Sequence, residues 1–480
     1  MSGVTVALLG FAGMLGLIAL RAPIGLSMLI VGAAGYIHLS SGMAFFGYMK
    51  SNAYHQFANY TLSVIPLFIL MGALAERAGI AAALFKSAEG AFGRFRGGLA
   101  MSVIGACTAF GAICGSSVAT TATFGRAALP ELLRYKYDGG FATGTIAVGG
   151  TLGILIPPSV ILVVYAITTE QNIAKLFQAA LIPGLIAAFF YCITIAIMVR
   201  RNPALAPLSE TVKIEKPAQP WWPKIIGGLA LAAIMVQVVR GQLAWDNAAV
   251  FAMLAVIFAI TDVAVMPAIM IAIVVVGGIY GGIFTPTEGA AVGAIAMLVI
   301  GVARKSLGWT DIIEALRQTA ETSGMIFIIL LGAEVFGAFL ALSRLPTVAA
   351  ETIGSLGYSP YTVLIAMLAL YILLGAVMDE LAMILLTLPV FFPVIQALDF
   401  GMPADDVAIW FGILVLIVVG IGLTAPPIGL NVFVISSIAR TIPIAETYRG
   451  VLPYIVADII RLSLVVAFPG LCLWMVHFFQ

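Results

Sequence analysis

Two short polar stretches interrupt long apolar runs, and their residue types could bind ions. The first, "GSSVATTATFG" at 115–125, supplies glycine, serine and threonine. The second, "VMDELA" at 377–382, supplies Asp379 and Glu380. Carbonyl and hydroxyl oxygens are hard ligands that suit a small cation, whereas the free amides at the start of a helix suit a carboxylate. The two stretches therefore predict binding of a cation and of an anion.

Two further apolar segments contain paired prolines, within 153–158 and 422–427. Paired prolines remove two amide donors and push the preceding residue out of the helical region. Each segment is therefore predicted to form two half-helices around an unwound joint, with the second proline at the first position of the new half-helix. Such a joint exposes carbonyls on one side and amides on the other. The alternatives are a simple kink at the prolines and close helix packing at 115–117.

The presence or absence of ionisable side chains in these segments indicates which cation binds. Residues 97–125 and 139–169 contain no Asp, Glu, His, Lys or Arg, so this half cannot store a proton on such a side chain. Sodium is therefore expected there. Asp379 and Glu380 could ligate a cation or titrate, which leaves proton coupling open for the second half.

The composition places these stretches in an all-α polytopic membrane protein. Of the 480 residues, 62% are apolar and 9% are charged, against roughly a quarter charged in soluble domains. Apolar runs of about twenty residues recur along the chain, each long enough to cross a bilayer. The net charge of +1 argues against nucleic-acid binding. No histidine lies inside a predicted span near Ser116 or Ser117, so a serine hydrolase is not expected and the chain is predicted not to be an enzyme.

The helices in 97–130 and in 361–398 are too short to cross separately, so each pair is predicted to be a re-entrant hairpin. With both hairpins re-entrant, most Lys and Arg of the short loops fall on one side, which is then the cytoplasm. Arg96, Lys136, Arg201, Arg304 and Lys305 belong to this side. The predicted crossings are 4–20, 24–38, 58–75, 141–168, 176–199, 225–240, 247–262, 267–284, 288–303, 323–342, 406–438 and 451–473.

The two halves of the chain resemble each other. "IPLFILMGALAERAGI" at 65–80 is similar to "MIFIILLGAEVFGAFLALSRLP" at 325–346, and "GILIPPSVILVVYAI" at 153–167 is similar to "GLTAPPIGLNVFVIS" at 422–436. An odd number of predicted crossings separates the start of the first repeat from the start of the second, so the repeats have opposite orientations in the membrane. Inverted repeats are an architecture of secondary transporters, with binding sites where the repeats meet.

These features predict six parts of the chain. They are N-terminal scaffold helices at 1–60, a first inverted repeat at 61–199, a cytoplasmic linker at 200–224, scaffold helices with an expected extra pair at 225–303, a second inverted repeat at 323–450 and a C-terminal helix at 451–480.

Several other polar residues have a structural interpretation. Thr285 and Glu288 are predicted to form a capping box around Pro286. Asp458 and Arg461, three positions apart on one helix, are expected to pair. Glu334 lies inside a predicted span with no visible partner, and both a functional and a structural role stay open.

Six ordered motifs resemble the large membrane subunit of tripartite ATP-independent periplasmic (TRAP) transporters: "IPLFILMG", "GSSVA", "GGTLGILIPPS", "GGIYGGIFTPTEGAAVGA", "MDELAMILLTLPVFFPV" and "GLTAPPIGLNVFV". The resemblance implies the ion-transporter-superfamily fold and sodium-driven import of an organic acid through the bacterial inner membrane by an elevator motion. It also implies a small four-helix membrane subunit and a periplasmic substrate-binding protein as partners. A stand-alone sodium- or proton-coupled carboxylate carrier of the same superfamily is the alternative.

The resemblance also implies the binding residues. Sodium, as two or more ions and with no organic cofactor, would bind at two places. The first comprises Gly115, Ser116, Ser117, Gly150, Thr151 and Pro157, and the second comprises Asp379, Gly422 and Thr424 together with Asn431. The acid would lie between the hairpin tips, near Ser117, Thr120, Thr121, Pro158, Ser159, Glu380, Pro427 and Asn431.

Overall fold

A computed structural model describes residues 2–93, 95–207 and 265–479, and within these ranges the secondary structure is entirely helical. Seven of the described helices are long and apolar enough to cross a membrane, or eight if one bent pair is a single span. This confirms the polytopic helical class. The predicted crossings at 225–240 and 247–262, and most of the linker at 200–224, lie outside the described residues.

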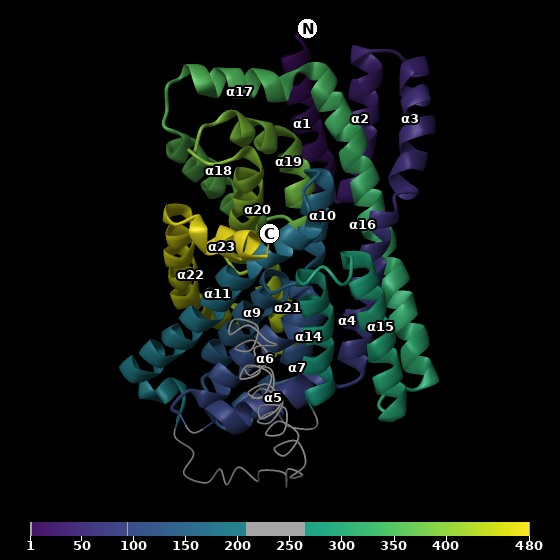
Figure 1. Cartoon of the computed structure of the whole chain (residues 1–480). Helices are drawn as coiled ribbons and strands as arrows, with labels where there is room; N and C mark the ends of the chain where they lie inside the picture. The colour runs from purple at the N-terminus through teal and green to yellow at the C-terminus, as the bar shows by residue number, and fades with distance from the viewer. Residues whose placement is uncertain (1, 94, 208–264, 480) are drawn as a thin grey trace, which may run out of the picture.

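A group of long helices forms one side of the molecule (Figure 1). It comprises α1 (Gly3–Ala19), α2 (Ile24–Leu39), α3 (Gly42–Phe57), α4 (Val64–Arg77), α14 (Met266–Tyr280), α15 (Pro286–Ala303) and α16 (Trp309–Ser343). Glycines of α2 allow close packing on α16: a Cβ on Gly25 would lie 2.9 Å from Ile329 Cα, and one on Gly32 would lie 2.8 Å from Phe336 Cα. We call these seven helices the scaffold group.

Both predicted hairpins are broken at the expected residues. The first consists of α6 (Gly98–Cys114) and α7 (Ser117–Ala127), and the second of α18 (Pro360–Gly375) and α19 (Glu380–Ala397). In Figure 1 the first hairpin occupies the lower half of the molecule and the second occupies the upper half. The polar stretches at 115–117 and 377–380 therefore form the tips of two hairpins that come from opposite ends.

Both paired-proline segments are broken helices, as expected. α9 (Gly139–Leu155) is followed by α10 (Val160–Thr168) with a bend of 44°, and α20 (Ala404–Gly422) is followed by α21 (Leu430–Ile438). We call residues 156–159 the first joint and residues 423–429 the second joint. The prediction that the second proline begins the new half-helix is wrong. An extended Ser159 precedes α10 and a left-handed Gly429 precedes α21, so α10 begins two positions after Pro158 and α21 begins three positions after Pro427.

The same succession of elements occurs twice along the chain. A first helix, a connecting helix, a hairpin, a broken helix and a final long helix follow each other in both halves, and the short α8 (Leu129–Arg134) is an additional piece of the first half. The connecting helices are α5 (Ile80–Phe92) and α17 (Leu345–Ser355), and the final long helices are α11 (Ile173–Arg201) and α22 (Ile444–Ala467). The other short pieces are α23 (Gly470–Phe478), η1 (Tyr60–Ser63) and η2 (Pro203–Leu205).

Two predicted segments differ from the structure in their boundaries, and one helix was not predicted. α16 begins at Trp309 rather than near residue 323, because its first turns carry charged residues that a hydropathy pattern leaves out. The segment 451–473 is two helices, since α22 ends at Ala467 and Pro469 precedes α23. α3 was not predicted, because its sequence mixes aromatic and polar residues and much of its surface is exposed.

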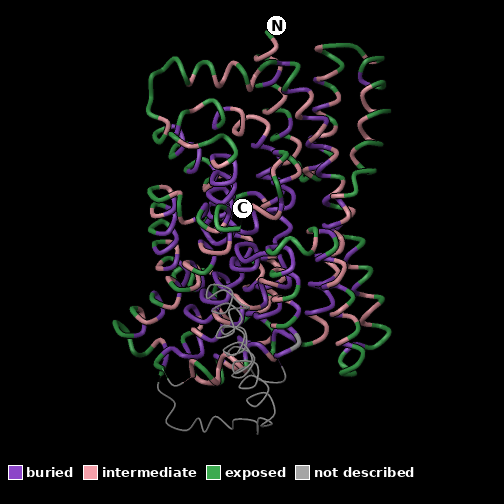
Figure 2. The backbone as a smooth tube through the Cα atoms, viewed as in Figure 1, coloured by how far each residue is buried: buried purple, intermediate pink, exposed green. Residues whose placement is uncertain are grey.

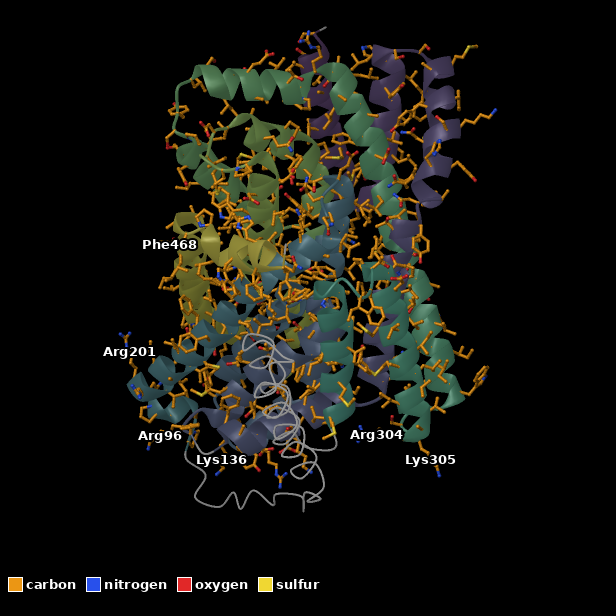
Figure 3. All side chains as sticks on the ribbon, viewed as in Figure 1. Arg96, Lys136, Arg201, Arg304, Lys305 and Phe468 are labelled. Atoms are coloured by element: carbon orange, nitrogen blue, oxygen red, sulfur yellow. The ribbon has the colours of Figure 1, made fainter. Side chains whose placement is uncertain are left out.

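The core lies in the broken helices (Figure 2). All of 140–155 in α9 and all of 407–422 in α20 are buried. Helices that are apolar and buried all round occupy the centre of a large protein. Five labelled basic residues lie away from this core, in the lower half of the molecule (Figure 3): Arg96, Lys136, Arg201, Arg304 and Lys305. This is the end predicted to be cytoplasmic.

Candidate functional site

The first hairpin tip lies directly on the first joint. Gly115 ends α6 with a φ of +64°, a backbone conformation that favours glycine. A Cβ on Gly115 would lie 2.8 Å from the Pro158 carbonyl oxygen and 3.6 Å from Ser159 Cα. On α9, a Cβ on Gly153 would lie 2.6 Å from the Ser116 carbonyl oxygen. Glycines on both sides thus bring main chain against main chain where both helices are interrupted.

The second hairpin tip lies on the second joint in a similar way. Asp379 caps α19, because its Oδ1 accepts the amides of Leu381 at 3.1 Å and Ala382 at 3.0 Å. A Cβ on Gly422 would lie 2.7 Å from Gly375 Cα. The backbone amide of Ile428 donates to the Ala376 carbonyl over 3.2 Å.

Asn431 links the second joint to the first hairpin. Its Nδ2 donates to Ser117 Oγ over 2.7 Å and to the Ala147 carbonyl over 3.0 Å, and its backbone amide donates to the Leu423 carbonyl over 3.0 Å. The stretch 423–431 therefore contacts both hairpins. The predicted grouping of Asn431 with Asp379 is not what the side-chain contacts show, because its amide lies at the first tip.

Three side-chain oxygens around the first tip have no hydrogen-bond partner within the described structure: Thr121 Oγ1, Ser159 Oγ and Asn431 Oδ1. All three residues are completely buried. Buried polar atoms are almost always paired, so free ones indicate a ligand or ordered water. Neutral oxygens of this kind fit a small hard cation, and these residues fit sodium.

The hydroxyl groups of three other predicted residues form hydrogen bonds within the protein. Thr120 donates to the Ser116 carbonyl over 2.7 Å, and Thr424 donates to the Ile421 carbonyl over 3.0 Å, which leaves their oxygen lone pairs available. Thr151 faces elsewhere, since its hydroxyl bonds to the Val148 carbonyl at 2.7 Å and to Tyr191 at 3.2 Å. Its side chain therefore lies on another side of α9 from the first tip.

The two joints differ in exposure. Gly150, Pro157 and Pro158 are buried, whereas Pro427 is exposed. A Cβ on Gly150 would clash with Thr121 Oγ1, so this glycine lets α7 pack closely on α9. The first joint is therefore enclosed within the protein, and the second joint presents one face outward.

A buried polar group next to α9 was only partly predicted. Arg461 Nη2 lies 2.8 Å from Asp458 Oδ1, which confirms the expected pair. The Tyr191 hydroxyl, 2.9 and 2.8 Å from the two Asp458 carboxylate oxygens, donates to that carboxylate. A lone tyrosine in an apolar helix gives no signal in the sequence, so the contribution of Tyr191 could not be found before the fold was known.

The remaining predicted polar groups have partners. The Thr285 and Glu288 capping box is confirmed, with the Thr285 amide donating to Glu288 Oε2 over 2.8 Å. Asn52 Nδ2 on α3 donates to Glu334 Oε1 over 3.2 Å, so Glu334 has a partner within the scaffold group. Glu76 at the end of α4 pairs with Arg126 near the end of α7, which joins the scaffold group to the first hairpin.

Known proteins of similar sequence are transporter subunits. The sequence model of the tripartite ATP-independent periplasmic transporter DctM component matches residues 11–471. The C4-dicarboxylate TRAP transporter large permease protein of Pseudomonas aeruginosa is 31% identical over 418 residues, which is 86% of each chain. The sialic acid TRAP transporter large permease protein of Vibrio cholerae is 29% identical over 97% of each.

The fold is also similar to a solved structure. The YdaH transporter of Alcanivorax borkumensis superposes with a TM-score of 0.59 over 89% of each chain at 15% sequence identity. At this identity the likeness concerns the fold alone.

Proposed function

Because the chain belongs to the DctM component family of tripartite ATP-independent periplasmic transporters, we propose that it is a permease subunit that imports an organic acid with sodium. The family consists of transporters and not of enzymes, and its members are multi-pass proteins of the bacterial inner membrane.

The observation that carries sodium coupling is the group of free oxygens around the first tip. Thr121 Oγ1, Ser159 Oγ and Asn431 Oδ1 come from α7, the first joint and α21, and none has a hydrogen-bond partner within the described structure. None belongs to a carboxylate, so a proton cannot replace the cation there. The main-chain carbonyl of Gly115 would supply a further ligand at the tip.

The arrangement of the hairpins supports an elevator mechanism with inverted repeats. The two halves have the same order of helices, and their hairpins lie in opposite halves of the molecule (Figure 1). The second joint bonds to the second hairpin through Ile428, and Asn431 at the start of α21 bonds to the first tip, so the hairpins and broken helices would move as one body against the scaffold group. The acid would lie between the tips, with its carboxylate toward free amides and hydroxyls.

The family is tripartite, and we propose two partners for this chain: a small four-helix membrane subunit and a periplasmic binding protein that delivers the acid. The experiment is uptake into liposomes that contain the membrane complex, with the binding protein outside. An inward sodium gradient should drive uptake, and omission of the binding protein should abolish it. Equal uptake with potassium would refute the coupling ion, and equal uptake without the binding protein would favour a stand-alone carrier.

A further inference from the structure

The tips and joints contain negative but no positive side chains. Within 97–125, 139–169, 361–398 and 407–439, Asp379 and Glu380 are the only residues among Asp, Glu, His, Lys and Arg. Arg126, near the far end of α7, is ten positions from Ser116, which is about 15 Å along a helix, and it pairs with Glu76. These four segments therefore bring to the candidate substrate site two carboxylates and no side chain that could pair with a second carboxylate of a substrate.

The two carboxylates differ in how they are used. Asp379 accepts two backbone amides as the cap of α19. Glu380 is the next residue, at the first position of the helix, and its Oε2 is enclosed by the protein with no hydrogen-bond partner within the described structure. At the second tip, Glu380 is therefore the carboxylate with an oxygen that is free to accept a hydrogen bond.

A carboxylate oxygen enclosed by protein without a partner is costly, and a cation brought by the substrate would lower that cost. A dicarboxylate would have the opposite effect, since its second charge would meet Glu380 with no Lys or Arg to offset it. The free oxygens of Thr121, Ser159 and Asn431, which we assign to sodium, are an independent sign that a ligand binds at the first tip.

From these contacts we infer that the transported acid is zwitterionic: it carries a protonated amine or amidine that pairs with Glu380, in addition to its carboxylate. This inference rests on the proposed function and narrows its substrate class. Glu380 acts as a specificity residue: the amides and sodium of the site bind the carboxylate, and Glu380 binds the cationic nitrogen.

The test uses matched acids and the complete complex in liposomes under an inward sodium gradient. The probes are 4-aminobutyrate with butyrate and succinate, β-alanine with propionate and malonate, and a cyclic amidine carboxylate. Wild-type protein should take up 4-aminobutyrate and β-alanine at least about tenfold faster than the matched acids that lack nitrogen, as expected for one charge-assisted hydrogen bond. The cyclic amidine carboxylate should also be taken up. Glu380→Gln should remove most of this preference by slowing only the nitrogen-containing acids.

The control variant is Glu131→Gln, which removes an exposed carboxylate on α8 that pairs with Arg134. It should leave the preference unchanged.

Sodium-driven uptake that favours the dicarboxylates or the simple acids would overturn the inference but not the proposed function. The inference also fails if Glu380→Gln keeps the preference and loses only a pH dependence of uptake, because Glu380 would then carry a proton. Absence of any sodium-driven uptake would count against the proposed function itself.

Discussion

Asn431 Nδ2 donates to Ser117 Oγ over 2.7 Å, across 314 positions of the chain. A residue of the second broken helix thus completes the polar surroundings of the first hairpin tip. The same amide group leaves Oδ1 free beside that tip. A cation bound there would take ligands from both halves of the chain, so its binding would require the two halves to be in place together.

Ser117→Ala should raise the sodium concentration that gives half-maximal uptake by about fivefold, the effect of one lost hydrogen bond, and Asn431→Ala, which also removes the free Oδ1, should raise it at least as much. The double variant should be little worse than the poorer single variant, because both changes remove the same contact. The control is Ser437→Ala, whose exposed hydroxyl bonds only to the Val434 carbonyl of its own helix. A sodium titration of uptake checks this, and fully additive effects would contradict a shared site.

Gly422→Ala and Gly420→Ala form a matched pair on α20. A Cβ on Gly422 would lie 2.7 Å from Gly375 Cα, so hairpin and helix would have to separate. A Cβ on Gly420 would meet only Thr151 Cβ at 3.7 Å, which is ordinary contact. Overpacking costs about 1–3 kcal/mol, so Gly422→Ala should lower thermal stability and uptake while Gly420→Ala changes neither. Equal behaviour of the two variants would mean that the tip and the second joint do not pack as described.

The ion pair between Glu76 and Arg126 should respond to charge reversal. Arg126→Glu places two carboxylates together and should slow uptake, and adding Glu76→Arg should restore it. The Arg126 side chain is 58% exposed and the Glu76 side chain 21%, so the pair should contribute at most about 1 kcal/mol. A double-mutant cycle on uptake rates measures this coupling. No rescue by the second change would show that the pair has no part in joining α4 to α7 during transport.

Asp458→Asn should destabilise the protein strongly. It removes the charge that offsets Arg461, which is completely buried, and breaking a buried pair in this way costs about 3–5 kcal/mol. The control is Asp406→Asn, since Asp406 pairs with His477, whose side chain is about half exposed. Thermal unfolding of the purified complex compares the two variants. Similar melting temperatures would contradict a charged pair inside the bundle.

The sequence was sufficient to predict the positions where helices break. Gly115, Asp379 and the paired prolines act through their own backbone chemistry, which does not depend on the fold. The capping box of Thr285 and the pair of Asp458 with Arg461 were predictable for the same reason, because partners three positions apart meet on any helix.

Contacts between distant segments could not be predicted in this way. Nothing local to Asn431 indicates that its amide reaches Ser117 rather than Asp379, and nothing local to Thr151 indicates that it bonds to Tyr191. Both contacts depend on how α9, α11 and α21 pack. The start of each second half-helix was missed because the general preference of proline for the first helical position was outweighed by the turn that follows each pair.

The most direct test of sodium coupling is a simultaneous measurement of labelled sodium and labelled acid entering the same liposomes. The complete complex should admit both in a constant ratio as the acid concentration is varied, and Ser117→Ala should lower both fluxes together at limiting sodium. Acid that enters with no accompanying sodium would contradict the central claim that the interrupted helices couple a cation to the acid.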